Sequence, residues 1–150
     1  MTPEVIFHAA NLLALPFWLL MIALPKWSVT KRVMESFLAP VLFCAIYAVL
    51  VLPWLPAALP KLARPDLPTI AALLGTPEAA VVAWVHFLAF DLFAGRWEYL
   101  DAQERGVPHA LLAPCLVLTL MLGPLGLLCY LGARRWTTGK QSRNDAGPAR

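Results

Sequence analysis

Four apolar stretches dominate the chain and limit what it can fold into. Each approaches the roughly 20 residues that a helix needs to cross about 30 Å of hydrocarbon. Backbone groups in lipid must be hydrogen-bonded within the chain, so the stretches predict membrane helices. They cover residues 5–24, 33–52, 76–99 and 110–131. The sequence therefore predicts an all-α polytopic membrane protein, with a four-helix transmembrane bundle over residues 1–135 and a short, disordered polar tail over residues 136–150.

The composition excludes an ordinary soluble enzyme. Of the 150 residues, 60% are hydrophobic and only 14% are charged, whereas a soluble domain has about 25% charged residues. So few charges could not cover a water-facing surface. The net charge of +3 is small, so we expect contact with membrane lipid and no nucleic-acid partner.

The ends and connections give weaker expectations. The N-terminus carries Glu4 and lacks a basic segment, which predicts a retained first span rather than a cleaved signal peptide. Prolines over residues 53–68 predict an extended, stiff connection between the second and third spans. With four spans, one side would hold Lys26, Lys31, Arg32, Arg96 and Arg105, and the other side the remaining seven of the twelve basic residues. This small bias favours both termini in the cytoplasm.

The third span is the informative one, because it carries ionisable residues where lipid would be. A central Asp or Arg costs about 2.5–3.5 kcal/mol on insertion scales, so such residues usually face the bundle interior and carry function. At 100° per residue, three carboxylates share one face of this helix. The polar residues on or just after the span are His86, Asp91, Arg96, Glu98 and Asp101, and the carboxylates on the shared face are Asp91, Glu98 and Asp101.

Two chemistries and one structural alternative fit these residues. Clustered carboxylates and a histidine in a low-dielectric cavity suit proton transfer on an apolar substrate, which makes all five candidate catalytic residues. With His109, the same set could also hold a divalent metal. No tight ligand spacing such as H-x-x-x-H is present, so neither a metal site nor another cofactor is predicted. Alternatively, Arg96, Glu98 and Asp101 form ion pairs at the membrane interface that fix the depth of the helix.

Residues outside the third span supply supporting groups. Asn11 in the first span could bond across to the third span and orient Asp91, or act as structural glue between helices. His109 follows the short loop after the third span. In the fourth span, Gly123 and Pro124 predict a kinked or flexible segment, and Thr119 is placed to satisfy local backbone groups.

Several motifs together resemble one small membrane family. They are NLLALP at 11–16, PKW at 25–27, TPEA at 76–79, WVHFLAFDLFAGRW at 84–97, GVPH at 106–109 and LTLMLGPLGL at 118–127. Over residues 4–133 the chain is similar to the abscisic-acid-deficient-four-like family. Its plant members act in plastids in the formation of neoxanthin, and its bacterial members are mostly classed as a domain of unknown function.

The resemblance implies a carotenoid or related isoprenoid ligand. In the chemistry of the plant members, a violaxanthin epoxide opens and a proton is lost to give an allene, which requires an acid and a base. Carried onto this sequence, Asp91, Glu98 and Asp101 are the candidate acids and bases, with His86 and Arg96 beside them. The plant members carry a transit peptide that is not seen here, so the expected location is a bacterial inner membrane.

Three functional hypotheses follow. The first is an enzyme, or a partner of one, that transfers protons on a carotenoid-like lipid in a groove between spans one, three and four. The second is a non-catalytic scaffold or accessory protein, acting as a homo-oligomer or with a membrane enzyme. The third is a small proton-coupled carrier, although no inverted repeat is visible.

Overall fold

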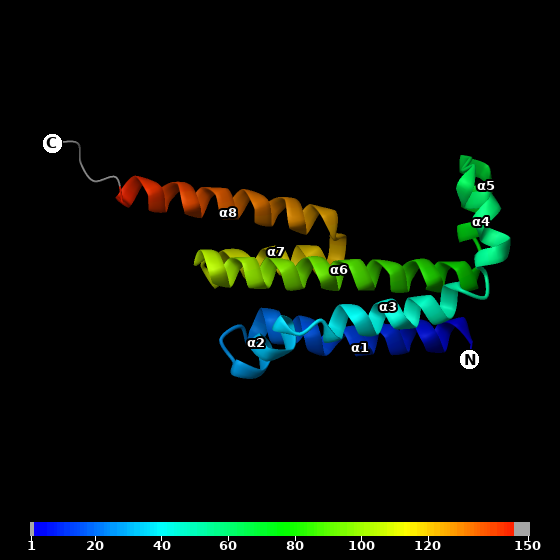
Figure 1. Ribbon diagram of the computed structural model, residues 1–150, viewed down its shortest axis with the longest axis horizontal. Helices are drawn as coiled ribbons and strands as arrows, with labels where there is room; N and C mark the ends of the chain where they lie inside the picture. Colours follow the sequence, from blue (N-terminus) through cyan, green and yellow to red (C-terminus); the bar gives the residue numbers. More distant parts are fainter. Residues whose placement is uncertain (1, 146–150) are drawn as a thin grey trace.

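The chain folds entirely into helices over the part that the structure describes. The computed structural model describes residues 2–145, with side chains through residue 137, and contains no strand in that part. This confirms the all-α prediction. Figure 1 shows an elongated bundle, and its helices are α1 (Pro3–Ala23), α2 (Ser28–Glu35), α3 (Leu38–Val51), α4 (Leu55–Ala63), α5 (Leu67–Leu74), α6 (Pro77–Arg105), α7 (His109–Leu122) and α8 (Pro124–Asp145).

Among the residues that the structure describes, two helices are long and apolar enough to cross a membrane alone. They are α1 with 21 residues and α6 with 29 residues, which agree with the first and third predicted spans. Thr76 caps α6 as its sequence predicts, since its hydroxyl accepts a hydrogen bond from the backbone N–H of Ala79 at 3.3 Å. At the other end, Gly106 adopts a left-handed backbone with φ of 66°, which ends the helix.

The second predicted span is bent. Its first part belongs to α2, and α3 begins only at Leu38 after a bend of 48° between the two helices. The pair is long enough for a third crossing only if it is taken as one bent span. α2 is amphipathic, with Thr30 and Met34 buried and Lys31 and Arg32 exposed, as expected for a helix at the membrane surface.

The fourth predicted span is wrong, because residues 110–131 do not form one helix. α7 ends at Leu122, Gly123 has a φ of 36°, and α8 begins at Pro124 and runs back beside α7 (Figure 1). With 14 residues, α7 is only about 21 Å long, too short for 30 Å of hydrocarbon. The structure thus has two or three candidate spans and a helical hairpin, α7–α8, instead of four spans.

The structure also differs from the sequence predictions for the proline-rich connection and for the polar tail. The proline-rich connection is not extended, since it forms α4 and α5, and a proline occupies the first turn of each, where the missing N–H costs little. α8 continues through Asp145, so the backbone of the predicted tail is helical from residue 136 to residue 145. Residues 146–150 of that tail lie outside the described residues.

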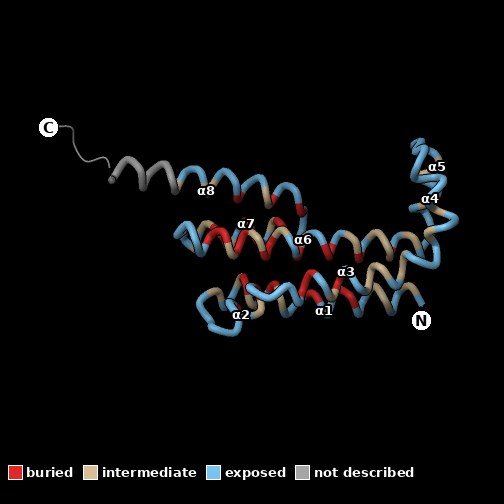
Figure 2. The backbone as a smooth tube through the Cα atoms, in the orientation of Figure 1, coloured by how far each residue is buried: buried red, intermediate tan, exposed pale blue. Residues whose placement is uncertain are grey.

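The core lies where α1, α6 and α7 pack together, whereas α4 and α5 contain no buried residue (Figure 2). Trp18 of α1 is only 1% exposed and lies directly against Gly95 of α6. A Cβ at position 95 would lie 2.6 Å from the Trp18 ring. Only glycine therefore allows α1 and α6 to approach this closely.

The hairpin moves the two ends of the described chain to opposite ends of the bundle. Pro3 lies at the end that carries α4 and α5, and α8 leads away at the end that carries α2 (Figure 1). The predicted placement of both termini on one side is therefore corrected. Of the basic residues up to position 137, those at the α4–α5 end are Lys61 and Arg64, and those at the α2 end are Lys26, Lys31, Arg32, Arg96, Arg105, Arg134 and Arg135. By the positive-inside rule, this asymmetry predicts that the α2 end faces the cytoplasmic side of the membrane.

We expect cysteine labelling to show this topology. In a variant with the three native cysteines replaced, a single Cys at Asp66, Glu104 or Trp136 would be tested with a membrane-impermeant maleimide on vesicles of both orientations. Asp66→Cys should label from one side, and Glu104→Cys and Trp136→Cys should label from the other. Labelling of Trp136→Cys from the Asp66 side would instead indicate a fourth complete span.

Candidate functional site

The three carboxylates of α6 share one face, as their spacing predicts, and this face packs against the α7–α8 hairpin. Each carboxylate meets a different part of it. Asp91 lies beside the turn at Gly123, Glu98 contacts Thr119 of α7, and Asp101 contacts Tyr130 of α8. The three groups therefore have three different environments.

Asp101 holds α8 against α6. It is 9% exposed, its Oδ1 pairs with Arg105 at 2.8 Å and Arg134 at 3.4 Å, and the Tyr130 hydroxyl donates to Oδ2 at 2.6 Å. Both oxygens are thus occupied by charged or hydroxyl donors. Such a carboxylate fits the structural alternative of an ion pair that fixes helix position.

Glu98 is fully buried between α6 and α7. The Thr119 hydroxyl lies 2.8 Å from its Oε1 and 3.0 Å from the Cys115 carbonyl oxygen, while Oε2 has no partner. Within the described residues, no ion pair neutralises the group. Because a hydroxyl has only one hydrogen, a proton on Glu98 allows both contacts to be hydrogen bonds at once. An ionised carboxylate in this place would be costly.

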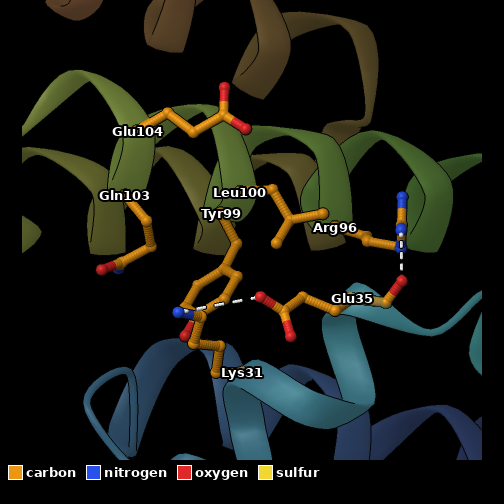
Figure 3. Close-up of a pocket in the computed structure, with 7 residues that line it drawn as sticks. All are labelled: Lys31, Glu35, Arg96, Tyr99, Leu100, Gln103 and Glu104. Carbon is orange, nitrogen blue, oxygen red and sulfur yellow. Dashed lines mark hydrogen bonds and ion pairs between the residues drawn. The ribbon is translucent and has the colours of Figure 1, made fainter.

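Arg96 points to the other side of α6, toward α2. Its Nε and Nη2 donate to the backbone carbonyls of Ser36 at 3.3 Å and Glu35 at 3.2 Å, and its guanidinium lies 4.0 Å from the Phe37 ring centroid. These contacts hold the bend between α2 and α3. Arg96 lies beside a polar pocket of about 510 Å³. In this pocket Lys31 and Glu35 form an exposed ion pair at 3.8 Å (Figure 3).

The histidines do not join the carboxylates. His86 faces α3, with its ring 5.3 Å from Tyr47 and 4.8 Å from Phe90, and so lies on a different side of α6 from Asp91. His109 begins α7, with Nε2 2.9 Å from the Ile22 carbonyl oxygen. Within the described residues, no three His, Cys, Asp or Glu side chains are grouped as a metal site would require.

Asn11 bonds across to the third span, as predicted, but to a different residue from the one expected. Its Oδ1 accepts a hydrogen bond from Trp84 Nε1 at 3.2 Å, and its Nδ2 donates to the Phe7 carbonyl at 2.8 Å. The expectation that it orients Asp91 is therefore corrected. Asn11 fixes the position of Trp84, two turns of helix before Asp91.

Asp91 differs from the other carboxylates because it has no hydrogen-bond or ion-pair partner among the described residues. It is half-buried at the centre of α6 and lies against the hairpin turn, where a Cβ on Gly123 would overlap its Oδ1. We call the space along this side of α6 the Asp91 groove. Besides Asp91, it is lined by Trp84, Phe87, Leu88, Phe90, Phe93, Ala94 and Trp97 of α6, and by Leu120, Met121, Leu122, Gly123, Pro124, Leu127 and Leu131 of the hairpin.

The groove forms between the third span and the hairpin, and the first span contributes through the bond from Asn11 to Trp84. The sequence pattern does not predict Tyr130 as a partner of Asp101, or Thr119 as a partner of Glu98. Neither pairing carries a sequence signal, since each depends on α8 folding back. The Gly-Pro pair at 123–124 was the available signal for a turn.

Comparisons with known proteins agree with the membrane-helical fold. Residues 5–130 match a family model described as ABA DEFICIENT 4-like. Over 133 residues the chain is 30% identical to Protein ABA DEFICIENT 4, chloroplastic, of Arabidopsis thaliana, covering 83% of this chain and 58% of that protein. The chain thus spans less than two thirds of this relative's length. No solved structure matches the chain.

Two glycines of α8 allow a matched test of the hairpin packing. A Cβ at Gly126 would overlap Thr119 of α7, whereas a Cβ at Gly132 meets nothing within 4 Å. We expect Gly126→Ala to lower the free energy of unfolding by about 1–3 kcal/mol, as overpacking does. Gly132→Ala should leave it equal or slightly higher, since alanine favours helix. Thermal unfolding in detergent measures both, and equal effects would contradict the close packing of α7 and α8.

Glu98 gives a second test. If Glu98 carries a proton, glutamine resembles it in shape and charge, so Glu98→Gln should change stability by less than about 1 kcal/mol. Thr119→Val removes the partner of a buried polar group and should cost about 1–3 kcal/mol. A Glu98→Gln protein that unfolds as readily as Thr119→Val would show that the group is ionised.

Proposed function

The chain belongs to the ABA DEFICIENT 4-like family, and from this premise we propose that it acts on a carotenoid or related isoprenoid lipid by proton transfer from Asp91. One observation carries the proposal: Asp91 is a carboxylate without a partner in an otherwise apolar groove. An ionisable group within a membrane helix is costly, and such groups usually serve a function. The apolar walls suit a polyene chain, and the carboxyl group is suited to donate a proton to an oxygen atom of such a ligand.

A single carboxyl group can complete the chemistry that the family resemblance implies. Protonated Asp91 donates its proton to an epoxide oxygen while one C–O bond breaks. The carboxylate then accepts the proton that leaves a neighbouring carbon as the new double bond forms. The product is an isomer of the substrate, and Asp91 regains its proton. The step therefore needs neither an oxidant nor a second catalytic group.

The other predicted site residues have supporting roles in this proposal. Asp101 holds α8 in place through Tyr130 and Arg134, and Glu98 holds α7 through Thr119. Both keep the hairpin turn beside Asp91. Arg96 holds the α2–α3 bend, and His86 packs against α3, so neither is proposed to touch the substrate.

Apolar helices and a chloroplastic relative support membrane association. The bacterial inner membrane stays a prediction for this chain, as does a homo-oligomer or a membrane enzyme as partner. The scaffold and carrier hypotheses are favoured instead if the protein keeps its activity without the Asp91 carboxyl group.

We expect Asp91→Asn to abolish the activity while the protein accumulates normally in the membrane, because the amide cannot donate and regain a proton. The measurement compares lipid and pigment extracts by chromatography and mass spectrometry among wild type, a deletion strain and the deletion strain carrying each variant. Both the deletion and Asp91→Asn should accumulate the same precursor.

The control is His86→Gln, which replaces another polar residue within α6 on the side that faces α3. It should leave the extract like that of wild type. If Asp91→Asn restores the wild-type extract, the proposed proton transfer is wrong and a scaffold role is favoured. Loss of activity through loss of protein would also count against the proposal, because it would make Asp91 a structural residue.

A further inference from the structure

The Asp91 groove has two arms, one on each side of the hairpin turn. One arm, of about 670 Å³, runs between α6 and α8 and is lined by Phe93, Ala94, Trp97 and Leu131 among others. The other, of about 210 Å³, runs beyond the turn and is lined by Trp84, Phe87 and Met121 among others. Asp91, Gly123 and Pro124 line both arms. The carboxyl group therefore borders both arms.

Both arms are apolar, and Asp91 supplies the ionisable group in each lining. Several walls are open to the lipid, since Phe87 is 55% and Phe90 61% exposed, so a ligand can enter sideways from the bilayer. Trp84 is fixed by Asn11 at the far end of the smaller arm. Along α6, the distance from position 84 to position 97 is about 20 Å at 1.5 Å per residue.

We infer that the groove selects lipids whose polar oxygen lies in the interior of the molecule, with apolar chain on both sides. This inference rests on the proposed function and narrows its substrate class. A ligand with a terminal oxygen can reach Asp91 only by leaving one arm unfilled, or can fill both arms only by leaving Asp91 without a partner. A ligand with an internal oxygen fills both arms and bonds to the carboxyl group at once.

Two isomers of octadecanol provide the test, one with the hydroxyl at the middle of the chain and one with it at the end. Binding of each tritiated alcohol is measured on the purified full chain in nanodiscs, with partition into empty nanodiscs subtracted. The middle isomer should bind about tenfold more tightly, a difference of about 1.4 kcal/mol. Asp91→Leu should remove this preference.

Ala94→Phe fills the larger arm, and Ala45→Phe is the matched control because it fills a separate surface groove between α1 and α3. Ala94→Phe should weaken binding of the middle isomer about tenfold, while Ala45→Phe should change the binding of neither isomer. Equal binding of the two isomers to the wild type would overturn the inference and leave the proposed apolar site intact. If neither isomer binds above the empty nanodiscs, the groove is not a lipid site, and the proposed function fails with the inference.

Discussion

The turn at Gly123 and Pro124 is the feature on which the rest of the structure depends. Without it, residues 110–131 would continue as one apolar helix across the membrane. With it, α8 returns beside α7, so the hairpin reaches only part of the way along α6. This brings the basic residues of α8 to the α2 end, gives the described chain its asymmetry of charge, and places the turn against Asp91. One local break in a helix thus decides the topology and creates the groove.

The three carboxylates of α6 show how the same chemical group takes different roles in different surroundings. Asp101 is held by two arginines and a tyrosine, and Glu98 by one threonine. Both gain partners only because the hairpin packs on them, and both tie it to α6. Asp91 gains no such partner within the described residues and keeps an accessible carboxyl group. A membrane protein bears the cost of such a group where function requires it, since an apolar residue would be more stable there.

Glycines allow the helices of this small bundle to pack closely in defined positions. The Trp18 ring lies against Gly95 where α1 crosses α6, and Thr119 lies against Gly126 where α7 meets α8. Lipid tails are as apolar as the side chains, so moving an apolar side chain from lipid into the protein gains little free energy. Close van der Waals contact must therefore hold the helices together. The bond between Asn11 and Trp84 adds a polar contact between α1 and α6. The groove therefore lies between α6, which is packed closely against α1, and a hairpin whose two helices are packed closely against each other.

The sequence alone determined the helical class, the two long spans, the cap at Thr76 and the shared face of Asp91, Glu98 and Asp101. These follow from apolar length and from 100° per residue, which are properties of single helices. These properties of single helices do not predict which residues of different helices come into contact. Only the tertiary structure decided that residues 33–52 bend, that residues 110–131 fold back, that Arg96 turns to α2, and that Asp91 alone of the three carboxylates stays unpaired among the described residues. The physical reason is that a glycine-proline pair in an apolar segment permits either a kink or a reversal. The choice depends on the contacts that α8 makes with Asp101 and α7 after the turn.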